Sequence, residues 1–263
     1  MNTFASTVER GIATLHMHDA ATSNAIDIDV VRAIHHALDG ILTRQGEARA
    51  VIITGGDDVF CSGIDLHTVD THSPDARQGA HFEMRRFMNH LIERLSGFPL
   101  PIIAAVNGAA VEAGMSLALA CDIIVASENA YFTPSFAHLG LVPDAGITFH
   151  LPRSIGTARS LSSMLLSEKI DAQTALEWGL VYAVVPRDEV LSRAMPIAER
   201  LMASPSVVLA QIRALHAQSP VNSLTEQLSG EQSAQEARVE IHDFVEGVRA
   251  LFDKREPHFT DHQ

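Results

Sequence analysis

Cysteine and basic residues are scarce in this sequence, and each shortage excludes a class of protein. Two cysteines in 263 residues, Cys61 and Cys121, cannot build the framework of bridges that supports small secreted folds, and they suit a reducing compartment. Nineteen lysines and arginines stand against 32 aspartates and glutamates, which gives a formal net charge of −13. Such a charge opposes binding to a nucleic-acid backbone or an anionic membrane surface. We therefore expect no nucleic acid and no membrane among its partners.

Long hydrophobic runs are also missing. The longest uncharged apolar stretch, residues 100–111, contains Pro101, Asn107 and Gly108 and is far shorter than the about 20 residues that span a bilayer. The first 30 residues contain no apolar segment of the signal-peptide type, and residues 261–263 are not a peroxisomal address. These observations predict a cytoplasmic protein.

The remaining composition is that of an ordinary compact globular protein. Apolar residues make up 46 % of the chain, charged residues 19 % and aromatic residues only 5 %. This balance excludes intrinsic disorder and fibrous repeats, and the length is enough for one large core. The 14 histidines show no metal-ligand spacing with cysteine or aspartate, so no metal is expected.

Hydrophobic periodicity predicts alternating strands and helices in the first half of the chain. Helical spacing of apolar residues is found in segments 30–42 and 84–95. Short apolar runs of the strand type occupy residues 12–17, 49–54, 101–106 and 122–126. The alternation predicts an α/β architecture with nearly parallel sheets.

From Leu151 onward the pattern becomes helical, with one short apolar run at residues 181–185. Asp171 is a predicted N-cap and Gly179 closes the same helix, while Ser204-Pro205 predicts the start of another. A last amphipathic stretch runs from about residue 224 to about residue 255. We predict two parts: an α/β core at residues 1–190 and a helical region at residues 191–263.

Two glycine-containing loops follow predicted strands and could present backbone N–H groups to a ligand. The first spans residues 55–66 and the second spans residues 107–122. In the second loop, small residues open a helix whose first N–H groups have no intrahelical acceptor. Taken singly, each loop is more typical of a plain turn between a strand and a helix than of a ligand site.

Together with five other segments in the same order, the two loops resemble the crotonase superfamily, the enoyl-CoA hydratases and isomerases. The matching segments are Ser23-Asn24-Ala25, residues 60–66, 106–122, 140–144, 151–153, 175–186 and 246–259. The resemblance implies a crotonase-like spiral of repeated ββα units. It also implies a C-terminal helical trimerisation region, in a homotrimer or a dimer of trimers.

The resemblance further implies an acyl-CoA thioester substrate, with coenzyme A as part of that substrate and no separate cofactor. The thioester oxygen would accept hydrogen bonds from the main-chain N–H groups of Ile64 and Ala113, the oxyanion hole. Side chains or main chain around the CoA and acyl group would be supplied by Ser62, Gly63, Asp65, Leu66, Gly114, Phe136 and Lys254. Arg255 would approach the CoA phosphates together with Lys254.

The sequence departs from the family at the two glutamates that add water to a double bond. Ser116 and Phe136 stand at those positions, and neither side chain can exchange a proton near neutral pH. Asp144 matches the single carboxylate of isomerase members, although its Pro-Asp-Ala-Gly setting is also ordinary turn chemistry. Glu112 replaces a glycine of most relatives, and it is expected either to cap the following helix or to act as a second acid or base. His138, a further candidate, is more typical of a structural histidine.

These residues predict an enoyl-CoA isomerase that moves a double bond through Asp144. Three alternatives remain open. The first is a hydratase that uses Glu112, and the second is an acyl-CoA hydrolase or dehalogenase with Asp144 as the nucleophile. The third is an acyl-CoA-binding protein without catalysis, which is favoured if Asp144 faces solvent.

Overall fold

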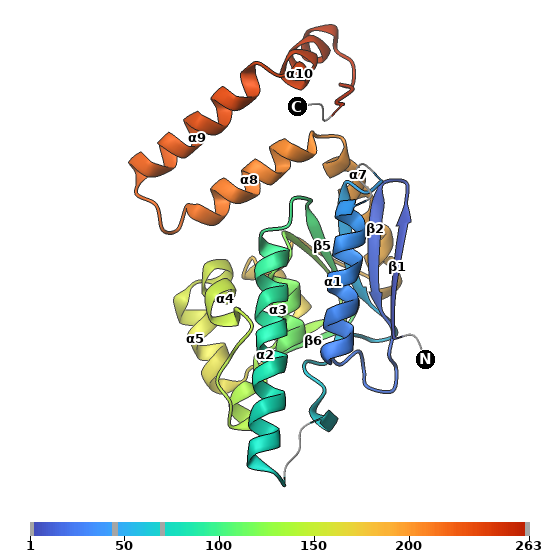
Figure 1. The fold of residues 1–263 in the computed structure, drawn as a ribbon, viewed down its shortest axis with the longest axis vertical. Helices are drawn as coiled ribbons and strands as arrows, with labels where there is room; N and C mark the ends of the chain where they lie inside the picture. The colour runs from blue at the N-terminus through green and yellow to red at the C-terminus, as the bar shows by residue number, and fades with distance from the viewer. Residues whose placement is uncertain (1–2, 44–46, 69–71, 261–263) are drawn as a thin grey trace.

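The computed structural model describes residues 3–43, 47–68 and 72–260 and contains two sheets, helices on both sides of the larger sheet, and a helical end (Figure 1). The larger sheet has the order β1-β2-β3-β5-β7-β10 and the smaller one β4-β6-β8-β9. The strands are β1 (Phe4–Glu9), β2 (Ile12–Met17), β3 (Ala50–Gly55), β4 (Val59–Cys61), β5 (Ile102–Val106), β6 (Ala109–Val111), β7 (Ile123–Ser127), β8 (Tyr131–Thr133), β9 (Ile170–Asp171) and β10 (Ala183–Val185).

Successive pairs of strands divide between the two sheets, which produces a spiral. β3, β5 and β7 each enter the larger sheet, and β4, β6 and β8, which follow them, pair side by side in the smaller one. All these pairings are parallel, whereas β1–β2 and β8–β9 are antiparallel. The ββα repeat expected from the resemblance is therefore present.

Both faces of the larger sheet are apolar because helices cover both. In β3, Val51 and Ile53 point into the core shared with α1 and α2, while Ala50 and Ile52 point to the opposite face. The helices are α1 (Ile28–Thr43), α2 (Pro74–Ser96), α3 (Ala113–Leu119), α4 (Ile147–Ile155), α5 (Thr157–Leu166), α6 (Ala172–Glu177), α7 (Val190–Met202), α8 (Ser206–Gln218), α9 (Leu224–Val239) and α10 (His242–Asp253). The α/β prediction is confirmed.

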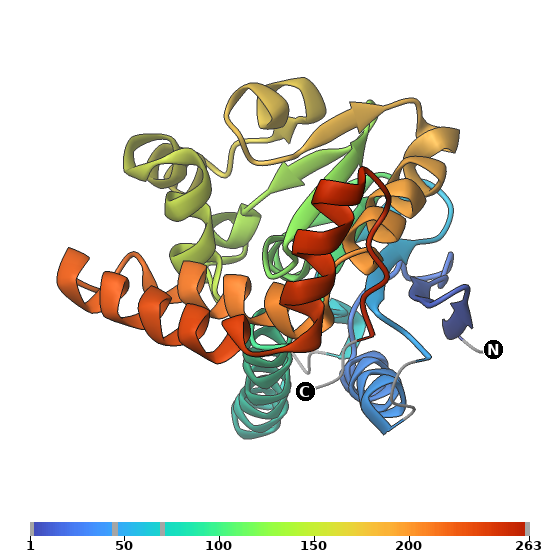
Figure 2. The same cartoon turned by 90° about the horizontal axis from the view of Figure 1, so that it is seen from above.

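α7 covers the second face of the larger sheet, where Ala194, Ile197 and Ala198 pack on β3, β5 and β7. It thus belongs physically to the sheet, and the division of the chain at residue 190 stays a prediction. α8, α9 and α10 form a separate layer at one end of the molecule, where α8 and α9 lie side by side (Figure 1). Figure 2 looks down on this layer from above.

Two predictions about the helical region are wrong. α8 begins at Ser206 with Pro205 as its N-cap, so Ser204 does not cap it. The stretch expected to be continuous from about 224 to about 255 breaks after Val239, and α10 has Ile241 as its N-cap. By contrast, the Asp171 carboxylate accepts a hydrogen bond from Thr174 N at 2.7 Å, and Gly179 has a φ of 79°, so both caps of α6 are confirmed.

Candidate functional site

After β4 the first loop forms a single bridge with Ile26, and the N–H of Ile64 points away from Ile26. Ile26 N donates to Gly63 O at 2.7 Å, and Asp65 N donates to Ile26 O at 3.0 Å. In a parallel bridge of this kind the flanking residues make the bonds, so the N–H of Ile64 points to the other side. Within the described residues this N–H has no acceptor.

Two asparagine side chains form hydrogen bonds with the main chain of the first loop. Asn24 Nδ2 donates to Val59 O at 2.6 Å, and Asn107 Nδ2 donates to Asp57 O at 2.8 Å. Asn107 Oδ1 also accepts from Gly55 N at 3.1 Å, at the end of β3. These amide side chains bond main-chain groups between the end of β3 and the start of β4, and so fix the segment that connects the two sheets.

The second loop runs from β6 into α3 and lies against the first. A Cβ on Gly114 would overlap the carbonyl oxygen of Cys61, so only glycine permits this approach of α3 to β4. Ala113 is the first residue of α3, and its N–H likewise has no acceptor in the part of the chain that the structure describes. The two amides singled out by the sequence are therefore both available as donors on adjacent loops.

Glu112 does not cap α3, which corrects one of the two interpretations made from the sequence. It occupies the N-cap position, but its side chain makes no capping hydrogen bond. Instead Glu112 Oε1 accepts from Ser135 Oγ at 2.9 Å, and the carboxyl group is half-buried beside Gly63. Burial raises the pKa of Glu112, the Ser135 hydrogen bond acts in the lowering direction, and the charge of Asp144 raises it.

Ser116 and Phe136, at the positions of the hydratase glutamates, have structural partners. The Ser116 hydroxyl is fully buried and donates to Glu112 O at 3.2 Å and Asp144 O at 3.4 Å. Phe136 is buried in the core, and no proton exchange is available from either side chain. Ser116 therefore joins the two segments that carry the carboxylates.

Asp144 forms an ion pair with Arg85 of α2. Arg85 Nε lies 3.0 Å from Asp144 Oδ2, and the Asp144 side chain is 16 % exposed. The turn that follows has positive φ at Ala145 and Gly146, 49° and 79°, before α4 begins. Asp144 is thus held close to the second loop rather than directed into solvent.

The other residues named from the sequence have the following surroundings. Ser62 Oγ donates to Thr22 O at 3.1 Å, and Asp65 Oδ1 accepts from His67 N at 2.9 Å. Gly63 has a φ of 100°, and Leu66 and His138 are exposed. None of these contacts identifies a ligand, so their binding roles stay predictions.

Lys254 and Arg255, the two basic residues after α10, have different surroundings. Lys254 is exposed and closes the helix in a left-handed conformation. Arg255 forms two bonds of 2.6 Å and 2.9 Å with the Glu246 carboxylate, which lower the pKa of that carboxyl to about 2. Arg255 is therefore paired with a carboxylate of α10, the helix that it follows, and the roles of Lys254 and Arg255 at the CoA phosphates stay predictions.

Two residues of this neighbourhood, Arg85 and Ser135, were missed by sequence reasoning. Ser135 opens the short 3-10 turn after β8, directly before Phe136, where only its place in the chain marks it. Arg85 stands beside the buried apolar stripe of α2 that includes Met84 and Met88, so a charge bordering that stripe was the available signal.

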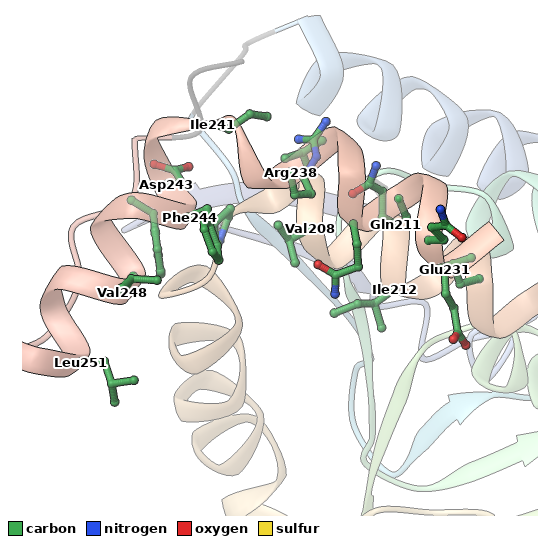
Figure 3. A pocket seen from close by; sticks show the side chains of 18 of the residues that line it. Val208, Gln211, Ile212, Glu231, Arg238, Ile241, Asp243, Phe244, Val248 and Leu251 are labelled. Carbon is green, nitrogen blue, oxygen red and sulfur yellow. The ribbon is translucent and has the colours of Figure 1, made fainter. Parts of the chain in front are cut away.

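Two surface hollows are described, and both lie away from these loops. One, of about 730 Å³, is an apolar groove between α8, α9 and α10, where Val208, Ile212, Phe244, Val248 and Leu251 face a common space (Figure 3). The other, of about 620 Å³, lies between β1 and α1. Across the described ranges there is no cluster of three metal-ligating side chains, and no helix is long and apolar enough to cross a membrane.

The comparisons with known proteins agree over almost the whole chain. A family model described as "Enoyl-CoA hydratase/isomerase" matches residues 7–262. A probable enoyl-CoA hydratase of Rhodobacter capsulatus is 37 % identical over 96 % of both chains. A 1,2-epoxyphenylacetyl-CoA isomerase of Escherichia coli is 35 % identical over 97 % of both. A crystal structure of an enoyl-CoA hydratase from Polaromonas superposes with a TM-score of 0.92 at 32 % identity, covering 98 % of this chain and 99 % of that one.

Proposed function

The chain belongs to the enoyl-CoA hydratase/isomerase family, the crotonase superfamily, and on that premise we propose that it is an acyl-CoA isomerase that transfers a proton through Asp144. The substrate is an unsaturated acyl-CoA thioester. Its carbonyl oxygen accepts hydrogen bonds from the amides of Ile64 and Ala113.

The proposed reaction needs one carboxylate and no water. Asp144 takes a proton from C2 of a 3-enoyl thioester, and the electron pair moves onto the carbonyl oxygen as an enolate. Preorganised N–H donors stabilise that charge, and losing one such donor typically costs about 3 to 4 kcal/mol of barrier. Asp144 then returns the proton to C4, and the double bond lies between C2 and C3.

The observation that carries this proposal is the replacement of the hydratase pair. Water addition requires a base to activate water and an acid to supply a proton. Ser116 and Phe136 supply neither, since the Ser116 hydroxyl is bonded to two carbonyls and Phe136 is buried. Asp144 remains beside the second loop, and Ser116 Oγ lies 3.4 Å from its carbonyl oxygen.

The Arg85–Asp144 pair bears on the alternatives. A hydrolase or dehalogenase stays an alternative, because a guanidinium 3.0 Å from the carboxylate would orient Asp144 as a nucleophile as well as a base. A binding protein without catalysis is favoured if Asp144 faces solvent, and the 16 % exposure of its side chain does not favour it. A hydratase that uses Glu112 keeps support from the closeness of its carboxyl to Asp144, whose charge raises the pKa of Glu112.

The first prediction tests Asp144 directly. Conversion of 3-enoyl-CoA to 2-enoyl-CoA, followed optically, should fall by about 100-fold or more in Asp144→Asn, because the proton acceptor is removed. Asp29→Asn makes the same change at an aspartate that is 86 % exposed on α1, and it should keep the wild-type rate.

Urea unfolding and binding of CoA should show that Asp144→Asn is folded. Full isomerase activity in the folded Asp144→Asn protein would rule out Asp144 as the base.

A further inference from the structure

The backbone of Glu112 has a conformation that residues other than glycine rarely adopt. Its φ is 48° and its ψ is −111°, in a region that costs a non-glycine residue about 1 to 3 kcal/mol. Main-chain bonds on both sides fix it: Glu112 N donates to Thr133 O at 2.9 Å, and Ser116 N donates to Glu112 O at 2.9 Å. The surrounding structure therefore determines where the side chain begins.

The carboxyl group lies between the two loops that supply the amide donors. Its Oε1 accepts from Ser135 Oγ at 2.9 Å. Its Oε2 would be 3.6 Å from a Cβ built on Gly63, the residue before Ile64, and Ala113 directly follows Glu112. Among the described residues Oε2 has no hydrogen-bond partner, so one oxygen is anchored and the other is available.

The charges around this carboxyl favour its protonated form. Burial is the largest cause that raises the pKa of Glu112, and the charge of Asp144 adds to it, against the hydrogen bond from Ser135. Arg85 pairs with Asp144, and the structure shows no ion pair between Glu112 and a cation among the described residues. On the loop and 3-10 turn that face Glu112, the neighbours Gly63 and Ser135 are uncharged.

An enolate would strengthen this preference. A second negative charge close to an ionised Glu112 is unfavourable by Coulomb repulsion, especially where water is partly excluded. A protonated Glu112 would instead donate a hydrogen bond to the same oxygen. A carboxylic acid that is kept neutral in order to stabilise an enolate is an established device in other enzymes.

We propose that Glu112 is a catalytic residue that donates a third hydrogen bond to the thioester oxygen, from its protonated carboxyl group. This inference rests on the proposed function, because it needs the enolate that Asp144 generates. Glu112 keeps its proton throughout, with Ser135 fixing Oε1 and Oε2–H directed at the oxygen. Asp144 alone takes the C2 proton and returns it.

The second prediction measures enolate formation by itself. In D2O, exchange of the C2 protons of a saturated acyl-CoA such as butyryl-CoA requires the enolate but neither isomerisation nor hydration. Glu112→Ala should lower the exchange rate by about 100-fold, the loss expected for one donor. Glu112→Gln keeps an N–H donor of similar shape, and it should recover at least ten-fold over Glu112→Ala.

The pH profile separates a donor from a base. The wild-type rate should fall as the pH rises through the pKa of Glu112, whereas Glu112→Gln should show no alkaline fall of this origin because its amide does not ionise. Glu128→Gln, an exposed change between β7 and β8, serves as the matched control and should keep the wild-type profile.

Two results would overturn the inference in different ways. If Glu112→Gln is as slow as Glu112→Ala while the wild type exchanges, Glu112 is not a donor, and the role of Asp144 stands. If the wild type does not exchange at any pH, no enolate forms, and the proposed function fails with it.

Discussion

At the scale of single residues, the site is defined by a few main-chain groups and two carboxyls with different neighbours. The Asp144 carboxylate is paired with Arg85, whereas the Glu112 carboxyl accepts a hydrogen bond from the Ser135 hydroxyl. Two titratable groups whose surroundings differ in this way are suited to different roles in one reaction. We therefore propose proton transfer for Asp144 and hydrogen-bond donation for Glu112.

The third prediction concerns the amide of Ala113. Ala113→Pro removes one N–H, and proline is accepted at the first position of a helix, so α3 can still form. Turnover should drop by about 100-fold. The check is the isomerase rate alongside a circular dichroism spectrum, and an unchanged rate in a folded variant would remove Ala113 from the oxyanion hole.

The fourth prediction concerns stability at Glu112. Glycine adopts a φ of 48° without strain, so Glu112→Gly should raise the free energy of unfolding by about 1 kcal/mol after the entropy of glycine is subtracted. A carboxyl with a raised pKa stabilises the fold fully below its unfolded pKa, and this contribution is lost as the pH rises through the folded value. The gain in Glu112→Gly should therefore be larger at pH 8 than at pH 5.

Urea unfolding at the two pH values measures this difference. A loss of stability in Glu112→Gly at pH 8 would show that neither backbone strain nor burial of the carboxyl is costly at this position.

The site residues could be found from the sequence only in part. Asp144, Ser116 and Phe136 are found because they occupy fixed places in segments that resemble a family. The role of Glu112 needed the structure, because capping a helix and facing Ser135 are equally compatible with the same position in the chain. Arg85 lies 59 residues before Asp144, and no local pattern connects a helix face to a turn so far away.

At the scale of elements, the long apolar runs were predictable and the short strands were not. The run at residues 12–17 is β2, and both predicted caps of α6 are present. β4, β6 and β8 have only three residues each, too few for a period-two pattern, and they form because neighbouring strands pair with them. Ser204 resembled a cap, but the helix begins two residues later.

Arg213 of α8 connects the helical layer to the body. Its Nε lies 2.6 Å from Asp122 Oδ1, its Nη2 donates to Leu95 O at 2.9 Å at the end of α2, and its Nη1 bonds Phe98 O. Asp122 in turn accepts from Ile102 N at 2.7 Å. The guanidinium of Arg213 thus bonds the end of α2 and the carboxylate of Asp122, which directly precedes β7 of the larger sheet.

The fifth prediction follows from this arrangement. Arg213→Met should destabilise the protein by about 2 to 3 kcal/mol. The substitution removes the guanidinium from Asp122 Oδ1 and from the carbonyl oxygens of Leu95 and Phe98, which are partly buried. Arg32→Met breaks an exposed pair with Asp29 and should change the free energy of unfolding by less than about 0.5 kcal/mol. Similar urea midpoints for both variants would contradict a special role for Arg213.

At the scale of the whole molecule, several large apolar side chains are exposed, and some of them are neighbours in the chain. Leu251 of α10, which lines the groove in Figure 3, is 75 % exposed, and Phe252, the next residue, is 80 % exposed. Leu165 and Leu166 of α5 are each 69 % exposed. α9 has no buried residue. Exposed apolar patches commonly mark interfaces between chains. The assembly into trimers or hexamers expected from the sequence stays a prediction.

The central claim is that this family member moves a double bond and does not add water. Its most direct test is to incubate the wild-type protein with 3-enoyl-CoA in ¹⁸O-labelled water and to follow the products by mass spectrometry. The account predicts that 2-enoyl-CoA without label accumulates well before any other product. Rapid formation of ¹⁸O-labelled 3-hydroxyacyl-CoA, at a rate equal to or above that of isomerisation, would contradict it.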